Sequence, residues 1–197
     1  MTHVLNSLHI LLLGGILLLA GCSSAPTTNH GIAQSTSKSS LDEKFRGDYA
    51  SALKNLEAKE YAQANNGLNK IVASNPGFVD GWANLALAQL KTNDITQAKQ
   101  SATNALQLEP QSATLENLLG LIDVEDGAYK TAEKHYSRAL ELNPNLANAH
   151  YNLALLNDIY YQNVAKAIQH YERYLALINN ADPDTEAWVA ELKRKLK

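Results

Sequence analysis

Small and apolar residues recur along this chain at a fixed spacing, and three prolines mark the period. Pro76, Pro110 and Pro144 lie 34 residues apart. Twelve residues before each proline stands an alanine, and five residues before it a small or apolar residue: Ala64, Ala98, Ala132 and Ile71, Ala105, Ala139. A 34-residue period with small residues at fixed sites is typical of stacked helix–turn–helix units. The pattern therefore predicts an all-α fold.

Alignment on the prolines divides the region 41–182 into four units. The units cover residues 45–78, 79–112, 113–146 and 147–181. The fourth unit has no closing proline, and its second half is displaced by one extra residue, which we place in the turn around Tyr160–Asn163. No unit can bury its apolar face alone, so the array needs stacking between neighbours and a cap at its ends.

Residues 183–197 carry the signals of a capping helix. Asp182 is a suitable N-cap, and Pro183 then occupies the first helical position. Trp188, Val189 and Leu192 form an apolar stripe along the segment, and the Lys/Arg run at its end suits a helix C-terminus. We interpret this basic run as the end of a solvated helix and not as a nucleic-acid patch.

The residues at matching offsets resemble the tetratricopeptide repeat, whose pattern is W-x2-L-G-x2-Y, then A-x3-F, then P. The second unit supplies Trp82, Leu85, Ala86, Ala98, Ala102, Ala105 and Pro110, and the third supplies Leu119, Gly120, Ala132, Tyr136, Ala139 and Pro144. The first and fourth units match fewer positions. This resemblance implies an all-α solenoid of about four helix–turn–helix units with a C-terminal capping helix.

Charge and cysteine content exclude several kinds of function. The 17 basic and 20 acidic residues give a net charge of -3, and no basic run occurs beyond the short one in the capping helix, so nothing indicates a nucleic-acid surface. A single cysteine excludes an internal disulfide framework and any multi-cysteine metal site.

The N-terminus resembles a bacterial lipoprotein leader. Its apolar core, residues 10–20, is too short to span a bilayer, for which about 20 residues are needed, and matches a signal-peptide h-region. Leu19-Ala20-Gly21-Cys22 resembles the lipobox, so we expect a signal peptide over 1–21 and lipid on Cys22. The n-region lacks Lys and Arg. An uncleaved anchor, or an ordinary signal peptide with an incidental cysteine, is the alternative.

Residues 22–40 are rich in Ser and Thr and nearly free of large apolar side chains, which predicts a flexible tether behind the lipid. The lipoprotein resemblance also implies a location. An aspartate after the lipidated cysteine usually retains such proteins at the inner membrane, whereas here Ser23 follows. We therefore expect an anchor in the outer membrane that faces the periplasm.

The polar residues give little indication of catalysis. His135 and His170 occupy equivalent positions in neighbouring units, too far apart to share a metal ion. Asp123, Glu125 and Asp126 crowd the end of a helix, and we interpret them as a solvated turn. The chain contains no G-x-S-x-G, P-loop or H-E-x-x-H motif. We expect no enzyme activity, cofactor, metal or small-molecule substrate.

The tetratricopeptide resemblance implies that the first helix of each unit lines a concave groove. The candidate binding residues on that wall are Tyr49, Leu53, Leu87, Leu90, Asn117, Leu121, Tyr151 and Leu155. Position 9 of every unit is a leucine, and an exposed apolar strip of this kind usually marks an interaction site. The alternative is that packing within the short array buries the leucines.

These observations predict a membrane-anchored scaffold or adaptor of the bacterial cell envelope, which binds a protein segment in its groove. Lipoproteins of similar construction include pilotins, so the chain is distantly pilotin-like. The alternative is a structural accessory subunit of an envelope machine (pilus, secretion, TonB-type or cell-wall complex), packed through its convex face without a groove ligand.

Overall fold

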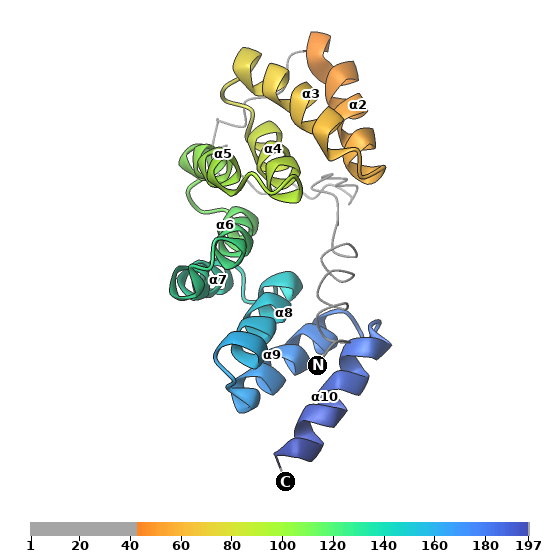
Figure 1. Cartoon of the computed structure of the whole chain (residues 1–197), viewed down its shortest axis with the longest axis vertical. Helices are drawn as coiled ribbons and strands as arrows, with labels where there is room; N and C mark the ends of the chain where they lie inside the picture. Colours follow the sequence, from red (N-terminus) through yellow and green to blue (C-terminus); the bar gives the residue numbers. More distant parts are fainter. Residues whose placement is uncertain (1–42, 197) are drawn as a thin grey trace, which may run out of the picture. The chain divides into compact units, whose positions relative to one another are not determined.

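The computed structural model describes residues 43–196 (Figure 1). The elements are the 3-10 turn η1 (Glu43–Phe45), α2 (Arg46–Glu57), α3 (Tyr61–Ser74), α4 (Val79–Lys91), α5 (Ile95–Leu108), α6 (Ala113–Glu125), α7 (Tyr129–Leu142), α8 (Ala147–Leu155), the π-helical turn η2 (Leu156–Tyr160), α9 (Val164–Leu177) and α10 (Pro183–Lys195). The predicted signal peptide, the lipidation of Cys22 and the tether lie outside the described residues.

The helices form four consecutive pairs followed by a single closing helix, which confirms the predicted all-α fold. We call α2, α4, α6 and α8 the A helices and α3, α5, α7 and α9 the B helices. Each A helix packs on its own B helix, each B helix packs on the next A helix, and successive A helices also touch one another. The A helices therefore form the inner row of the stack.

Each proline of the period lies just beyond the end of a B helix. The residues before Pro76, Pro110 and Pro144 leave the helical conformation, with φ of -130°, -134° and -141°. The ring of a proline disfavours the α conformation in the residue before it, and proline cannot continue a hydrogen-bonded helix. The 34-residue spacing thus fixes where the first three B helices stop.

A left-handed residue closes the turn between the A and B helices of every unit. Lys59, Asn93, Gly127 and Gln162 have φ of 61°, 62°, 74° and 52°. The first three are 34 residues apart, and Gln162 follows Gly127 by 35. Glycine adopts this conformation without strain and asparagine at low cost, so the turn chemistry is best in the second and third units.

The extra residue of the fourth unit is absorbed by a helix, not by the turn where the sequence placed it. The π-helical turn η2 ends the A helix at Tyr160, before Gln162 takes the left-handed conformation. A π turn accommodates an inserted residue because its backbone hydrogen bonds join residues five positions apart, whereas those of an α-helix join residues four positions apart. As a result the ring of Tyr160 stacks on Tyr129 of α7, with ring centroids 3.9 Å apart.

Small residues set how closely the helices pack. The four alanines Ala64, Ala98, Ala132 and Ala167 are fully buried, one in each B helix. Gly120 on α6 faces the ring of Tyr136, and an added Cβ would lie 2.6 Å from its Cδ1. Tyr136 and Tyr171 are among the largest fully or almost fully buried side chains, and they fill the space beside these small residues.

The last helix begins at Pro183 and closes the apolar core. The side chain of Asp182 accepts a hydrogen bond from the amide of Thr185 at 3.0 Å, as an N-cap does. Val189 and Leu192 are buried against Tyr171 and Leu175 of α9. Among residues 43–196, no helix is both long and apolar enough to cross a membrane.

Candidate functional site

The inner row of A helices carries the candidate binding residues. Leu53, Leu87, Leu121 and Leu155 occupy equivalent positions on α2, α4, α6 and α8, and each is partly buried. Leu53, Leu121 and Leu155 rest against apolar clusters of their own units with part of their surface. We call these four leucines the leucine ladder. Each of their side chains is partly buried and partly exposed.

Polar bridges join neighbouring A helices along the same row. The Nδ2 group of Asn84 donates to the hydroxyl of Tyr49 at 2.7 Å, and Nδ2 of Asn152 donates to Oδ1 of Asn117 at 2.9 Å. Burial is the main reason why the pKa of Tyr49 is raised to about 12, with Asp80 adding to it and the Asn84 bond opposing it. Tyr49 therefore stays neutral over the physiological pH range.

Two of the candidate residues belong to the interior. Leu90 is 8% exposed and packs with Ala98, Leu119 and Ile122 between the second and third units. Asn117 is 9% exposed, and its amide oxygen is used by Asn152. The candidate residues that keep part of their surface exposed are Tyr49, Leu53, Leu87, Leu121, Tyr151 and Leu155.

Aromatic rings and two aspartates fill the C-terminal end of the row. Tyr151 on α8 lies 4.9 Å from Tyr174 and 5.8 Å from Tyr171 between ring centroids. Asp158 on η2 accepts from the indole N–H of Trp188, and Asp182 accepts from the hydroxyl of Tyr174 at 3.1 Å. Through these bonds, and through the N-cap bond from Thr185 to Asp182, the two carboxylates help to hold α10 in place.

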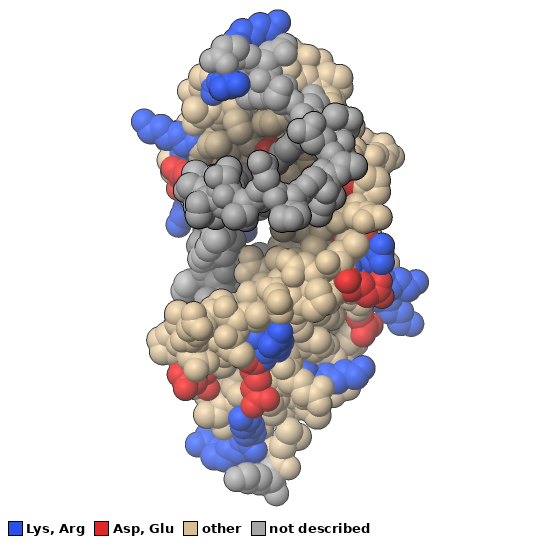
Figure 2. All heavy atoms as spheres, turned by 180° about the vertical axis from the view of Figure 1, so that it is seen from behind, with Lys and Arg blue, Asp and Glu red and all other residues tan. Residues whose placement is uncertain are grey.

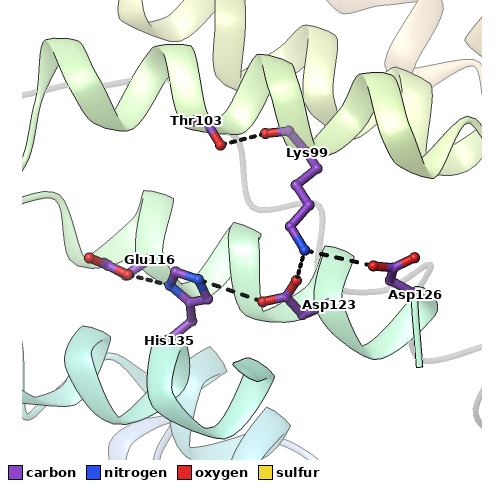
Figure 3. Close-up of polar contacts among 6 residues, drawn as sticks. All are labelled: Lys99, Thr103, Glu116, Asp123, Asp126 and His135. Atoms are coloured by element: carbon purple, nitrogen blue, oxygen red, sulfur yellow. Dashed lines mark hydrogen bonds and ion pairs between the residues drawn. The ribbon is translucent and has the colours of Figure 1, made fainter. Parts of the chain in front are cut away.

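A second polar group lies between α5, α6 and α7, where the sequence indicated a solvated turn (Figure 3). That interpretation of Asp123 is wrong, because its side chain is 0% exposed. Nζ of Lys99, on the preceding unit, lies 2.6 Å from Oδ1 of Asp123 and 3.7 Å from Asp126. Of the three acidic residues in this segment, Glu125 and Asp126 are exposed, as expected for a solvated turn, and Asp123 is buried.

His135 completes this polar group from α7. Its Nδ1 lies 2.6 Å from Oε2 of Glu116, and its Nε2 lies 3.6 Å from Oδ2 of Asp123, an oxygen that is buried without a hydrogen-bond partner. The hydrogen bond to Asp123 is the main reason why the pKa of Lys99 is raised. These polar contacts join three helices, and the Lys99–Asp123 ion pair ties the second unit to the third.

The spacing of polar residues in the sequence could have predicted that Asp123 is buried. Gln89, Asp123 and Asn157 follow one another at 34 residues, and all three are buried. Gln89 accepts from the hydroxyl of Ser101 at 2.7 Å, and Asn157 donates to the carbonyl of Leu153 at 2.8 Å. A polar residue repeated at one site of the last three units thus marks a buried polar position.

His135 and His170 occupy equivalent positions of neighbouring units but contact different partners. His135 meets carboxylates, whereas His170 on α9 meets His150 on α8, with 3.1 Å between their Nδ1 atoms. Within the part of the chain that the structure describes, no cluster of three or more His, Cys, Asp or Glu side chains could hold a metal ion.

Charges on the surface are mixed in sign. On the face shown in Figure 2, red and blue side chains stand near one another along the edges of the array, with uncharged surface between them. On the inner row, burial is the main cause that lowers the pKa of Lys91, while Glu125 opposes this shift.

Comparisons with known proteins identify the repeat. A family model described as TPR repeat matches residues 120–163. The array is similar to TTC0263 of Thermus thermophilus (20% identity, 76% of this chain, 81% of that chain, TM-score 0.68) and to pilF of Pseudomonas aeruginosa (24% identity, 79% and 70%, TM-score 0.69). It is also similar to the first TPR of Spaghetti (RPAP3) bound to an HSP90 peptide (20% identity, 60% and 94%, TM-score 0.56). No curated protein matches by sequence.

The chain folds as a tetratricopeptide-repeat solenoid. The tetratricopeptide repeat (TPR) is typically a scaffold for protein–protein interaction and not an enzyme. In this TPR array the A helices provide the inner surface, and the half-exposed leucine ladder runs along it.

Proposed function

We propose that this protein is a lipid-anchored scaffold of the bacterial cell envelope, which holds a segment of a partner protein against the inner row of its TPR array. The lipobox-like sequence before Cys22 and the Ser/Thr-rich stretch after it support the anchor and the tether. The observation that carries the binding function is the leucine ladder Leu53, Leu87, Leu121 and Leu155, which is present in every unit and keeps part of its surface free of the core.

The chemistry of the row indicates what kind of segment would fit. The charged residues Lys91 and Glu125 follow Leu87 and Leu121 by one helical turn, but the ladder positions themselves and the bridging positions beside them carry no charge: Tyr49, Ala83, Asn117, Tyr151, Ala50, Asn84, Leu118 and Asn152. Desolvating a charge against such a surface is costly. The partner segment is therefore one with an uncharged, apolar face, such as an amphipathic helix.

The ladder spacing agrees with a helical partner. Neighbouring helices pack about 8–10 Å apart, so the leucines of successive A helices recur at about this interval. A helix rises about 1.5 Å per residue, and apolar residues spaced by seven therefore recur at about the same distance. The peptide-bound TPR of RPAP3 is a related array that holds a peptide. Its acidic peptide SRMEEVD differs from the segment proposed here.

Charge placed on the ladder tests the proposal. Leu87→Glu with Leu121→Glu adds two carboxylates to the inner row, whereas Gln107→Glu with Ser137→Glu adds two to exposed positions of the B helices in the same units. Partners would be captured by cross-linking from native membranes, after circular dichroism shows that both variants are helical. We expect the first variant to lose about a hundredfold or more in partner capture, because buried carboxylates without partners cost several kcal/mol.

The same pair of variants tests the competing arrangement, an accessory subunit packed through the B helices without a groove ligand. The contact of Leu53, Leu121 and Leu155 with the core favours that alternative. A partner lost by the B-helix variant and kept by the folded ladder variant would establish it. Unfolding of the ladder variant alone would show that the leucines are core residues. The specific envelope machine, including a pilotin-like role, would follow from the identity of the captured partner.

A further inference from the structure

Two histidines of the fourth unit face each other across its helix pair. Nδ1 of His150 lies 3.1 Å from Nδ1 of His170, and Nε2 of His150 lies 3.1 Å from the carbonyl oxygen of Pro144. A carbonyl oxygen can only accept, so Nε2 of His150 carries the hydrogen and donates it. Nδ1 of His150 is then a lone-pair acceptor, and His170 donates its Nδ1–H to it. This arrangement is complete with both rings neutral.

The surroundings of the pair favour the neutral rings. Burial lowers the pKa of His150, with Arg173 adding to the effect and the Pro144 carbonyl opposing it. Burial also lowers the pKa of His170, and His150 and Lys166 lower it further. A positive charge on either ring would thus be added near two that are already present, on Arg173 and Lys166.

Arg173 and Lys166 are the charged groups that act on the two rings, and the side chain of Asn145, in the loop before α8, accepts from Arg173 at 2.6 Å. Ion pairs and hydrogen bonds on the packed elements include Arg138–Glu141 on α7, Glu116–His135 and Asp123–Lys99 on α6, Trp188–Asp158 on η2 and Lys193–Glu172 from α10 to α9. None of these pairs places a carboxylate on either ring.

We propose that His150 and His170 form an acid-sensitive joint, which holds α8 against α9 at neutral pH and opens when both rings carry a proton. A first proton can enter at Nε2 of His170 and leave the bond between the rings intact. The second must enter at Nδ1 of His150, which is the acceptor of that bond. Two N–H groups and two like charges then face each other, next to Arg173 and Lys166.

The direction of the pH effect follows from the lowered pKa values. A histidine that is harder to protonate in the closed joint takes up protons on opening, so acid favours the open form. The joint is fully stable above the ordinary histidine pKa of about 6.5 and loses stability as the pH falls below it. For each ring, opening increases by at most about tenfold per pH unit between its open-state and closed-state pKa values.

The joint lies next to the proposed binding surface. Tyr151 directly follows His150 on α8. Its ring contacts Tyr171, which directly follows His170 on α9, and Tyr174, which lies almost one turn further along. Opening of the joint therefore displaces one end of the inner row. Acid-dependent release of a partner rests on the proposed function, whereas opening of the joint itself does not.

Hydrogen exchange of the full-length protein in detergent tests the joint. Exchange of α8 and α9 amides would be compared at about pH 7.5 and about pH 5, after correction for the intrinsic rate. We expect the protection of α8 and α9 to fall about tenfold or more at the lower pH, while α2–α5 change less than about twofold. Equal protection of α8 and α9 at the two pH values would overturn the proposal.

Two variants separate the histidine pair from general acid effects. His170→Gln keeps an N–H donor for His150 but cannot gain a charge, and we expect it to lose most of the pH response of α8 and α9. His135→Gln, at the equivalent site of the third unit, should keep the full response. A response unchanged in His170→Gln would refute the joint.

A titration covers the case in which His170→Gln does not fold. Imidazole NMR signals of the wild-type protein would give the pKa of each ring, and both are expected below about 6.5. Values at or above this level in the folded protein would also refute the proposal. If the joint opens but a captured partner stays bound at about pH 5, the joint stands and its link to the proposed function fails.

Discussion

The indole N–H of Trp188 on α10 donates to Oδ2 of Asp158 on η2 at a distance of 2.8 Å. Asp158 stands in the π-helical turn that absorbs the extra residue of the fourth unit. The hydroxyl of Tyr171 approaches the same oxygen at 3.5 Å. The insertion and the closing helix are therefore linked through one carboxylate.

Trp188→Phe should weaken this link, because phenylalanine keeps an aromatic ring but has no donor for Asp158. We expect a loss of about 1–2 kcal/mol in the free energy of unfolding, measured by urea denaturation followed by circular dichroism. Asp158→Asn keeps an acceptor oxygen and should cost less. A Trp188→Phe protein as stable as the wild type would mean that ring packing alone holds α10.

Removal of the Lys99 ammonium should destabilise the boundary between the second and third units. Lys99→Met leaves the buried Asp123 carboxylate without its 2.6 Å partner. Since the Lys99 side chain is 42% exposed, water can replace part of the interaction, and we expect a loss of about 1–3 kcal/mol.

Two further variants control the Lys99 experiment. Lys134→Met, on the exposed side of α7, should change stability by less than about 0.5 kcal/mol. Asp123→Asn combined with Lys99→Met should recover part of the loss, since it removes the buried charge. If the double variant is less stable than Lys99→Met alone, Asp123 is stabilised by another group.

Gly120→Ala should be destabilising, although alanine is the better helix former. The new methyl group would overlap the buried ring of Tyr136, with its Cβ 2.6 Å from Cδ1. Overpacking of this kind costs about 1–3 kcal/mol. Gly47→Ala on α2 is a matched control, because nothing lies within 4 Å of its added Cβ. Thermal unfolding should show opposite shifts for the two variants.

Cys22→Ser should release the protein from the membrane if the anchor is lipid. Loss of the acyl chains removes about 0.8 kcal/mol for each buried CH₂ group, far more than a folded TPR surface would replace. Membrane fractionation with a clickable palmitate analogue measures both location and acylation. Ser23→Ala should stay acylated and membrane-bound, and wild-type protein without label would exclude lipid on Cys22.

The sequence predicted the helix pairs well because prolines and small residues act locally. Pro110 fixes the end of α5 through its own ring, and Ala98 marks a close helix contact whatever its neighbours are. The capping helix was equally readable, since Asp182 and Pro183 act on the first turn of the helix that they begin.

Side-chain contacts between units could not be predicted from the sequence in the same way. Asp123 looked like a surface residue because its partner Lys99 stands 24 positions earlier, on another unit. The sequence also showed one extra residue, which we placed in the turn around Tyr160–Asn163, but not that a π turn over Leu156–Tyr160 would absorb it. Whether each leucine of the ladder is surface or core depends on side-chain packing, which the repeat pattern does not specify.

The bridges between units join different kinds of helix at successive junctions, and we expect this to make the resistance of the array to bending depend on direction. Tyr49–Asn84 and Asn117–Asn152 fasten the inner row at the first and last junctions, while Lys99–Asp123 fastens a B helix to an A helix at the middle junction. We expect straightening of the array to stretch the A-helix bridges first. We expect tighter curling to load the B-helix to A-helix bridge of the middle junction instead, so that the two deformations are resisted by different residues.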